Sequence, residues 1–547
     1  MLSLADIKFR ITVIFMLFFM LYIVIILNLY NIQMRNTIFY TQLGQQQYYG
    51  LHTHAPPRGL IYDRNGTLLT LNQDCLSAFV LPKQLKDAET TLLFLKKYFP
   101  QAYQQLKEQP LKQFLYIKRN LSAPQQELIT TKGTQDIQLL AEPHRFYPVG
   151  EAAPVIGAID IDGNGIIGAE LQYNQTLAGV PTTCYLDKDA RSGNYYFAKH
   201  SQVDGTDGAP VYLTIDSNLQ FLVREAVKVT VEKFKALEGY ALVMNPVNGE
   251  IAAMVTYPHF DPNDTTITDL SQTKNKVVTD AYELGSVIKT FAALAALQEN
   301  VVTPDELIDC KNTKTTYIDG RKINTPHAHG VIPFTDVVAL SNNIGTAIVA
   351  KRVGPRMYDH YTRLGFGTKT GIQFPGEHAG FVNHPDNWSK QSIISLSYGY
   401  EISATILQLA CALCIIANDG YPITPTLCLS DAKHPPHTSK PLYDAQPLET
   451  IKSILEHTTA HGTAQRARIN GYRVMSKTGT ANLLVDGAYD ESKNIFTCSG
   501  IIEKDNYKRV IVTFINQAQG TRLFASTVAV PLFEQVAQQV LINDRIL

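Results

Sequence analysis

A long uncharged segment near the N-terminus restricts the fold of this chain more than any other feature of its sequence. Residues 11–27 contain no charged side chain, and the apolar stretch continues to Tyr30. That is about the 20 residues that a helix needs to span a lipid bilayer. A cleaved signal peptide has a shorter apolar part that ends in small residues, and residues 28–33 offer no such cleavage site. We therefore predict an uncleaved transmembrane helix over residues 11–30.

The charges beside this segment predict its orientation. Lys8 and Arg10 precede it, which favours an N-terminus inside the cell, although Arg35 follows closely on the other side. No later segment reaches spanning length without a charge. The sequence therefore predicts a cytoplasmic tail over residues 1–10 and a single-pass protein of the cytoplasmic (inner) membrane. The bulk of the chain is then periplasmic or extracytoplasmic.

Length and composition exclude some classes of protein. A chain of 547 residues is too long for one hydrophobic core, so we expect two or more domains. The net charge of −1 gives no basic field, so nucleic acid is not an expected partner. The 7 cysteines are odd in number and widely spaced, which does not indicate a disulfide framework. Cys411 and Cys414 have the spacing of a redox or metal pair, but both also fit one side of an apolar helix, and no second pair of ligands lies nearby. We expect no metal and no cofactor.

Three short motifs follow one another in the second half of the chain. They are Ser286-Val-Ile-Lys289, Ser341-Asn342-Asn343 and Lys477-Thr478-Gly479, which have the forms S-x-x-K, S-x-N and K-T-G. Each motif alone is a weak signal. Together and in this order they are typical of active-site serine enzymes that open D-alanyl peptides and β-lactam rings.

The residue types in these motifs suit nucleophilic catalysis. A serine hydroxyl needs a base, and on a helix Lys289 would lie one turn from Ser286 on the same face. A lysine acts as a base only when neutral, and both burial and a nearby cation such as Lys477 lower its pKa. Ser341 can relay protons to the leaving group, and the amide of Asn343 can bind a peptide. We therefore assign catalytic roles to all five residues.

The third motif is expected on an edge strand of a sheet. There Gly479 would permit the close approach of a substrate backbone. Lys477, Thr478 and Thr480 together can hold a terminal carboxylate. We therefore predict that Thr478, Gly479 and Thr480 bind the substrate.

The surrounding sequence predicts one sheet built from both ends of the catalytic region. Residues 239–255 form two β-like runs around an Asn-Gly turn, and residues 507–515 return to a strand. Helices are predicted after a cap at Asp216 or Ser217, around the serine motif, and over residues 334–349 and 530–541.

The chain is similar to class B penicillin-binding proteins over nearly its whole length, about residues 10–540. The motifs that carry the resemblance are residues 58–66 (Arg-Gly-Leu-Ile-Tyr-Asp-Arg-Asn-Gly), Arg145-Phe-Tyr147, Gly168-Ala-Glu170, residues 245–250 and Tyr282-Glu283-Leu-Gly285-Ser286. The resemblance implies a membrane-anchored α+β protein. Its mixed α/β, non-catalytic pedestal domain of the dimerisation type would span residues 31–205. Its penicillin-binding transpeptidase domain, an antiparallel sheet flanked by helices as in serine β-lactamases, would span residues 206–547.

The resemblance also implies an activity. It is that of a peptidoglycan D,D-transpeptidase, a serine acyltransferase that cross-links stem peptides through an acyl-enzyme formed with D-Ala-D-Ala termini. Ser286 would be acylated, Lys289 would be the base, and the backbone N–H groups of Ser286 and Thr480 would form the oxyanion hole. The septal, cell-division (FtsI-like) branch is favoured by Tyr282-Glu283, residues 364–367 and residues 397–400.

The implied partners follow from this family. They are peptidoglycan stem peptides, β-lactams as inhibitors, the membrane, a SEDS-type (FtsW-like) glycosyltransferase, and other division proteins that would bind through the pedestal and the transmembrane helix. Three residues depart from the family pattern: Leu284 and Ile406 replace Pro, and Glu401 replaces Gly. Two other functions stay open: a D,D-carboxypeptidase or β-lactam-hydrolysing serine enzyme, and a non-catalytic division scaffold. The first lacks a recognisable second base for deacylation, and the second would not need three intact motifs.

Overall fold

The structure is a computed structural model that describes residues 4–188, 195–264, 269–429, 440–485 and 488–546. The chain forms two compact units, each made of two stretches of sequence. One consists of Met1–Pro57 with Ala178–Gly208, and the other of Arg58–Leu177 with Ala209–Leu547. The domain boundaries predicted from the sequence stay predictions.

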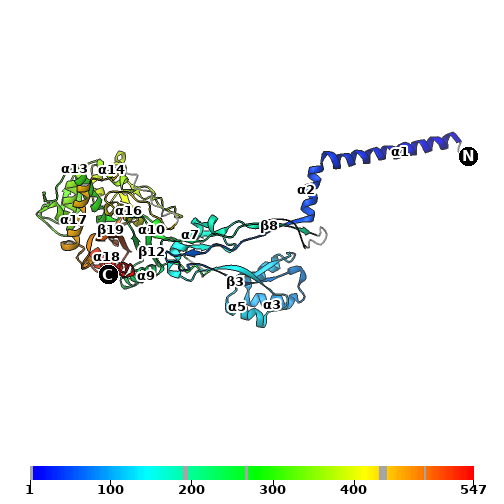
Figure 1. The fold of residues 1–547 in the computed structure, drawn as a ribbon, viewed down its shortest axis with the longest axis horizontal. Helices are drawn as coiled ribbons and strands as arrows, with labels where there is room; N and C mark the ends of the chain where they lie inside the picture. Colours follow the sequence, from blue (N-terminus) through cyan, green and yellow to red (C-terminus); the bar gives the residue numbers. More distant parts are fainter. Residues whose placement is uncertain (1–3, 189–194, 265–268, 430–439, 486–487, 547) are drawn as a thin grey trace. The chain divides into compact units, whose positions relative to one another are not determined.

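The first unit contains the apolar N-terminal helix. Helix α1 (Leu4–Tyr30, blue in Figure 1) includes all of the predicted span and buries none of its residues. Within the described chain it is the helix long and apolar enough to cross a membrane. A short π-helical turn, η1 (Asn31–Arg35), and α2 (Thr37–Tyr48) follow it. The unit also contains an antiparallel three-stranded sheet in the order β1-β8-β9 (Tyr49–His54, Thr182–Lys188 and Tyr195–Val203).

The second unit begins with a small α/β part. Its three strands pair in the antiparallel order β4-β3-β5 (Leu115–Lys118, Leu71–Val80 and Gln138–Phe146). Three helices share a hydrophobic core with this sheet: α3 (Ala88–Tyr98), α4 (Pro100–Glu108) and α5 (Ala123–Lys132). The carboxylate of Asp87 caps α3 by accepting from the backbone N–H of Thr90 at 3.1 Å. Short elements complete this part: β2 (Ile61–Tyr62), η2 (Pro82–Gln84), η3 (Gly150–Ala152), α6 (Ala153–Ile156), β6 (Ala158–Ile159), β7 (Gly165–Ile167), α7 (Gly168–Gln172) and α8 (Asn174–Ala178).

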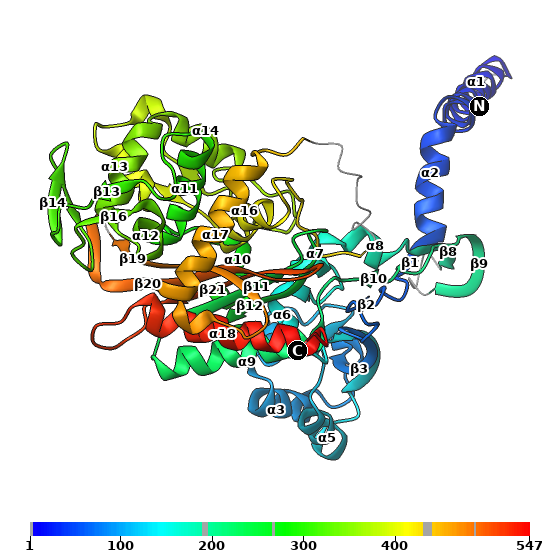
Figure 2. The same ribbon diagram turned by 60° about the vertical axis from the view of Figure 1, so that its left-hand side comes forward.

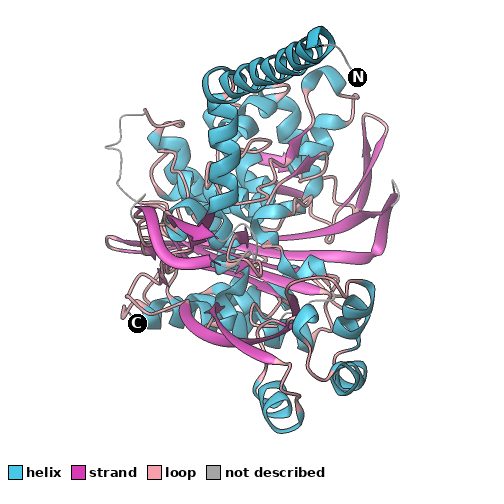
Figure 3. Ribbon diagram, turned by 90° about the vertical axis from the view of Figure 1, so that its right-hand side faces the viewer, coloured by secondary structure: helices cyan, strands magenta, loops and turns pink. Residues whose placement is uncertain are grey.

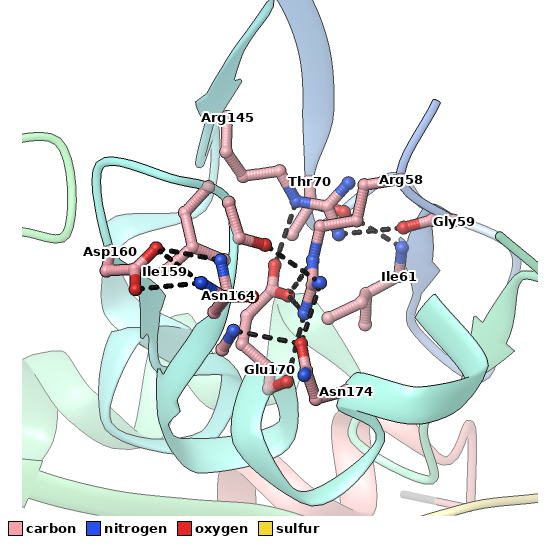
Figure 4. Close-up of polar contacts among 12 residues, drawn as sticks. Arg58, Gly59, Ile61, Thr70, Arg145, Ile159, Asp160, Asn164, Glu170 and Asn174 are labelled. Atoms are coloured by element: carbon pink, nitrogen blue, oxygen red, sulfur yellow. Dashed lines mark hydrogen bonds and ion pairs between the residues drawn. The ribbon is translucent and has the colours of Figure 1, made fainter. Parts of the chain in front are cut away.

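Three motifs that carry the family resemblance meet at one buried carboxylate (Figure 4). Glu170, which is fully buried, accepts from Nε of Arg58 at 2.7 Å and from Nε of Arg145 at 2.8 Å. Arg58 also donates to Asn174 Oδ1, and Arg145 donates to the carbonyl of Gly59, both at 2.8 Å. The two arginines therefore join residues 58–59, just before β2, to the end of β5 and to α7.

A five-stranded antiparallel sheet forms the centre of the catalytic part (magenta among the helices in Figure 3). Its order is β12-β11-β21-β20-β19, with bounds Ile251–Tyr257, Glu238–Met244, Tyr507–Asn516, Ala488–Lys504 and Arg473–Val485. Strands β11 and β12 form the predicted hairpin, whose turn contains Gly249 at φ +74°. Because β21 pairs with β11, the two ends of this region share one sheet, as predicted. The K-T-G motif lies on β19, the edge strand, also as predicted.

Helices cover both faces of this sheet (Figure 2). On β11, Ala241 and Val243 pack with α9 (Ser217–Lys233) and α18 (Ala525–Asn543). Tyr240, Leu242 and Met244 point to the other face, where they share a core with α11 (Lys289–Gln298), α16 (Ile406–Ala417) and α17 (Ala445–His461). This strict alternation explains why β11 is buried along its whole length.

Smaller elements surround the helical face. They are β10 (Val211–Tyr212), η4 (Leu270–Thr273), α10 (Lys276–Thr279), η5 (Gly285–Ile288), β13 (Leu307–Asp309), β14 (Thr315–Ile318), β15 (Arg321–Asn324), β16 (Val331–Pro333), α12 (Phe334–Ala339), α13 (Asn343–Val353), α14 (Arg356–Arg363), β17 (Phe381–Val382), η6 (Pro385–Asn387), α15 (Ser392–Ser397), β18 (Ile402–Ser403) and η7 (Gln465–Ala467). The helical prediction over residues 334–349 holds except at residues 340–342, because α12 ends at Ala339 and α13 begins at Asn343. Cys411 and Cys414 are both buried in α16, where burial raises the pKa of each thiol.

A turn at residues 63–66 fastens the small α/β part to the catalytic part. Oδ2 of Asp63, which is fully buried, accepts from the hydroxyl of Ser217 at 2.7 Å at the start of α9. Arg64 forms an ion pair of 3.0 Å with Glu250 beside the β11–β12 turn. The turn motif therefore has a structural role between two parts of the same compact unit.

Candidate active site

The serine of the first motif lies on a tight turn that leads into a helix. Ser286 belongs to η5, and α11 begins at Lys289, so the helical arrangement that the S-x-x-K spacing predicts is present. Gly285 has φ +61°, and a Cβ there would lie 2.9 Å from the carbonyl oxygen of Thr480. The half-buried side chain of Ser286 lines a cavity of about 590 Å³. The turn therefore presents the hydroxyl to a space that a substrate can enter.

The lysine of the first motif is completely buried beside this serine turn. Its Nζ donates to the carbonyl oxygen of Ser341 at 2.7 Å, to Oγ of Ser341 at 3.1 Å and to Oδ1 of Asn343 at 2.5 Å. Burial, and secondly the charge of Lys477, lower the pKa of Lys289 well below its ordinary value. This environment therefore favours the neutral form of Lys289, which is the form that can act as a base.

The second motif occupies the break between α12 and α13. Ser341 has φ +57°, a left-handed conformation that is uncommon outside glycine. Buried Asn342 then caps α13, because its Oδ1 accepts from the N–H of Gly345 at 2.9 Å. The Nδ2 group of Asn343 donates to the carbonyl of Asn324 at 2.6 Å, so the protein itself already binds both ends of this amide. Ser341, at this break, lines the cavity.

Both lysines of the motifs converge on one hydroxyl. Nζ of Lys477 donates to Oγ of Ser341 at 3.1 Å, the same length as the bond from Lys289. It also donates to the carbonyl of Thr478 at 2.9 Å. A hydroxyl oxygen that accepts two N–H bonds still has its own hydrogen to donate, so Ser341 can donate toward the cavity. Burial lowers the pKa of Lys477 to about 7.

The threonines of the third motif face the cavity, whereas Lys477 and Gly479 lie behind its lining. Oγ1 of Thr478 is 2.7 Å from Oγ1 of Thr463, and Oγ1 of Thr480 accepts from the N–H of Ala525 at 3.2 Å. The hydroxyls of this edge strand are thus held in place before any ligand binds. The positive charge of Lys477 lies behind them.

Gly479 has a packing role that its sequence context did not indicate. A Cβ at this position would lie 2.6 Å from the carbonyl oxygen of Leu284 and 3.0 Å from Cγ1 of Val287. Glycine is therefore required for β19 to approach the serine turn. Its predicted contact with a substrate backbone stays a prediction.

The three departures from the family pattern fit the structure. Leu284 is buried in the main core, and Ile406 occupies the first position of α16 behind Thr405, whose hydroxyl accepts from the N–H of Gln408 at 3.0 Å. Glu401 has φ +58°, which explains why a glycine would suit that position. Its carboxylate accepts from Nδ2 of Asn383 at 2.7 Å, an interaction that a glycine cannot form.

One wall of the cavity was not predicted from the sequence. It includes Arg321, Lys322 and Asn324 on β15, together with Tyr398 and Tyr400, and Tyr489 on β20. No motif spacing marks Arg321 or Lys322, because a short hairpin brings them to the site. The aromatic pair Tyr398 and Tyr400 was noted only as part of the family resemblance.

Two family models match the chain. The penicillin binding protein transpeptidase domain matches residues 239–538, and the penicillin-binding protein dimerisation domain matches residues 53–213. The first match covers more than half of the chain and contains all three motifs.

Individual relatives agree with this match. A probable peptidoglycan D,D-transpeptidase of Pseudomonas aeruginosa, PbpC, is 30% identical over 486 residues, which is 88% of this chain and 85% of that protein. The peptidoglycan D,D-transpeptidase FtsI of Escherichia coli is 28% identical over 500 residues, 88% of this chain and 83% of that protein. Penicillin-binding protein 3 of Mycobacterium tuberculosis, solved in complex with aztreonam, superposes with a TM-score of 0.67 at 26% identity, covering 90% of this chain and 98% of that one.

The fold and the convergent motifs define an active-site serine enzyme with a penicillin-binding transpeptidase domain. The chain belongs to the penicillin-binding protein family, as a class B member of the FtsI-like branch. The resemblance inferred from the sequence is confirmed.

Proposed function

We propose that this chain is a peptidoglycan D,D-transpeptidase that acts in septal cell-wall synthesis. The observation that carries the proposal is the convergence of Lys289 and Lys477 on Oγ of Ser341, each at 3.1 Å, beside the cavity that Ser286 lines. Three motifs far apart in sequence thus supply a nucleophile, a neutral base and a cation in one place. The relatives in Pseudomonas aeruginosa and Escherichia coli are named for the same activity.

Acylation is the first half of the proposed reaction. Oγ of Ser286 attacks the carbonyl carbon of the penultimate D-alanine, and its proton passes to neutral Lys289. The backbone N–H groups of Ser286 and Thr480 stabilise the oxyanion. When the peptide bond breaks, the departing amine of the terminal D-alanine takes a proton through the hydroxyl of Ser341.

Deacylation completes the cross-link. An amine of a second stem peptide attacks the acyl-enzyme ester and forms the new amide bond. The attacking amine gives up one proton and the released Oγ of Ser286 takes one up, so that the enzyme returns to its starting state. The hydroxyls of Thr478 and Thr480 bind the terminal carboxylate during acylation, with the charge of Lys477 behind them.

Covalent labelling with penicillin tests the assignment of the nucleophile. Ser286→Ala is expected to abolish labelling, measured as the mass added to the intact protein, while the thermal unfolding temperature stays within a few degrees of wild type. Ser526→Ala is the matched control, because Ser526 lines the same cavity but belongs to none of the motifs. Full labelling of the Ser286→Ala protein would contradict the proposal.

The proposed location is the cytoplasmic (inner) membrane, with one span and the bulk of the chain outside the cytoplasm. Lys8 and Arg10, in the first turns of α1 and ahead of its uncharged segment, support this orientation. An FtsW-like glycosyltransferase and other division proteins are proposed partners of the pedestal and the span. Protease added to spheroplasts is expected to digest the C-terminal part, and complete protection until lysis would overturn the topology.

A further inference from the structure

A buried carboxylate lies behind the serine turn. Glu238 begins strand β11, and its side chain is 8% exposed. Its Oε2 accepts from Nζ of Lys276 on α10 at 2.5 Å, and its Oε1 accepts from Nδ2 of buried Asn516 on β21 at 2.8 Å. None of these three is among the described residues that line the cavity beside Ser286. Any effect of this carboxylate on the reaction must therefore pass through other residues.

Glu238 keeps its charge in this buried place. Burial acts to raise the pKa of its carboxyl, but hydrogen bonds from Lys276, Tyr240 and Asn516 outweigh it, and the pKa is lowered. An ionised carboxylate can only accept hydrogen bonds. Glu238 is therefore the acceptor at which the hydrogen bonds of its neighbours end.

Two phenols connect this carboxylate to the serine turn. The hydroxyl of Tyr282 lies 3.3 Å from Oε1 of Glu238 and 2.9 Å from the hydroxyl of Tyr240. Each phenol has one hydrogen, so one of them donates to Glu238 and the other donates to its partner. The rings of Tyr240 and Tyr282 also pack against Phe514 on β21, with centroids 5.0 Å and 4.7 Å away. Tyr282 is therefore held both by its ring and by its hydroxyl.

The backbone of Tyr282 is fixed as well, shortly before the nucleophile. Its N–H donates to the carbonyl of Ala404 at 3.0 Å, and its carbonyl accepts from the N–H of Ala404 at 2.9 Å. The chain then runs to Gly285, which has φ +61° and lies directly before Ser286. A displacement of Tyr282 therefore reaches Oγ and the backbone N–H of Ser286 over a short stretch of chain.

Stability alone does not explain a buried ion pair at this place. Moving a carboxylate and an ammonium out of water costs free energy, and well-packed apolar side chains of similar size are often at least as stabilising. Phe514 and the two tyrosine rings already form such an apolar cluster here. What the ion pair and its directional hydrogen bonds add is orientation. Acylation depends on orientation, because small displacements of reacting groups cost large factors in rate.

We propose that Glu238, held by Lys276 and Asn516, is a positioning residue that fixes the serine turn through the phenol of Tyr282. The inference rests on the proposed function, because it requires that Ser286 is the residue acylated. It gives a role in the rate of acylation to residues of β11, α10 and β21 that belong to none of the three motifs.

Rapid kinetics of acylation by penicillin separate positioning from binding and from folding. The full-length protein in detergent gives a dissociation constant for the non-covalent complex, a first-order rate constant for acylation, and the fraction of protein labelled. Tyr282→Phe keeps the ring against Phe514 and removes only the hydroxyl. It is expected to lower the rate constant about tenfold, with the dissociation constant and the labelled fraction unchanged. A general folding defect would lower the labelled fraction instead.

Glu238→Gln gives the second arm of the experiment. It keeps the shape of the side chain but removes the charge, and it is expected to lower the same rate constant to a similar extent. The double variant should be no slower than the slower single variant, because both changes break one connection. Tyr257→Phe is the matched control: it removes a phenol that donates to Glu232 of α9 at 3.1 Å, on the other face of the sheet, and it should leave the rate constant unchanged.

The outcomes separate this inference from the function on which it rests. If penicillin labels the wild type at Ser286 and Tyr282→Phe acylates at the wild-type rate, the positioning role is refuted and the transpeptidase proposal stands. The same holds if the two single effects add in full, or if only the labelled fraction falls. If Glu238→Gln does not fold, Lys276→Gln, at the more exposed end of the ion pair, takes its place in the comparison. If penicillin does not label the wild type at Ser286, both proposals fail together.

Discussion

At the scale of single residues, the site depends on two lysines that share one acceptor. Acylation needs Lys289 neutral, so that it can take the proton of Ser286, and Lys477 charged, so that it can attract a carboxylate. The environment lowers the pKa of both groups: burial and the neighbouring cation hold that of Lys289 well below its usual value, and burial lowers that of Lys477 to about 7. The required combination of protonation states is therefore lost at both low and high pH.

These two requirements predict a bell-shaped pH dependence for the second-order rate constant of penicillin acylation, with an acid limb from protonation of Lys289 and an alkaline limb from loss of the charge on Lys477. In Lys477→Arg the alkaline fall should disappear, because arginine stays charged. In Lys477→Gln the maximum rate constant should fall to about one tenth of the wild-type value or below. The acid limb should also move to higher pH, because Lys289 loses the cation that depressed its pKa.

Stopped-flow acylation of the three proteins across the pH range measures these limbs. If Lys477→Gln has the wild-type rate and an unmoved profile, Lys477 neither binds the carboxylate nor tunes Lys289, and the third motif has only a structural role.

At the scale of elements, the site depends on how closely strand β19 approaches the serine turn η5. The approach is limited by Gly479, where a Cβ would lie 2.6 Å from the carbonyl oxygen of Leu284. Gly285 limits the approach from the side of the turn, because a Cβ there would lie 2.9 Å from the carbonyl oxygen of Thr480. A backbone atom cannot move aside as a flexible side chain can, so any side chain at Gly479 must separate the strand from the turn.

Gly479→Ala is therefore expected to lower the free energy of unfolding by about 1–3 kcal/mol and to slow acylation. The slower rate follows because the threonines of β19 move away from Ser286. Thermal unfolding and penicillin acylation measure the two effects. Gly330→Ala is the matched control, since a Cβ there would have nothing within 4 Å. Equal stability and equal rates in the two variants would show that the contact is not tight.

At the scale of the whole molecule, the turn at residues 63–66 joins the small α/β part to the catalytic part. Burial acts to raise the pKa of Asp63, but hydrogen bonds from Ser217, Thr67 and Asn65 outweigh it, and the pKa is lowered. A carboxylate with a lowered pKa in the folded state stabilises the fold above its unfolded pKa, and this contribution is lost as the pH falls through the folded pKa.

Asp63→Asn is therefore expected to reduce the free energy of unfolding by about 1–3 kcal/mol at neutral pH, because a buried set of hydrogen bonds loses its charged acceptor. The difference from wild type should shrink as the pH falls below about 4. Thermal unfolding at several pH values measures both. Asp305→Asn, at an exposed position, should show neither effect. A pH-independent difference for Asp63→Asn would mean that shape, not charge, matters at the turn.

Much of the architecture follows from local pattern. The apolar helix α1, the hairpin β11–β12 and the edge position of the K-T-G strand agree with the sequence predictions, because each depends on composition, turn chemistry or motif context over a short stretch. The break at Ser341 was not predicted, because it depends on the left-handed conformation of Ser341 and on the cap that Asn342 provides to α13.

The sequence by itself determined the reacting groups and their class, since a serine, two lysines and their spacing already define the chemistry of Ser286, Lys289 and Lys477. Only the tertiary structure decided how those groups meet. The shared hydroxyl of Ser341, the contact that requires Gly479 to be glycine, and the placement of Arg321 in the cavity wall each join residues that are far apart in the chain. The physical reason is that burial, distance and the charge of a neighbour set a pKa or a specificity, and these quantities exist only once the chain has folded.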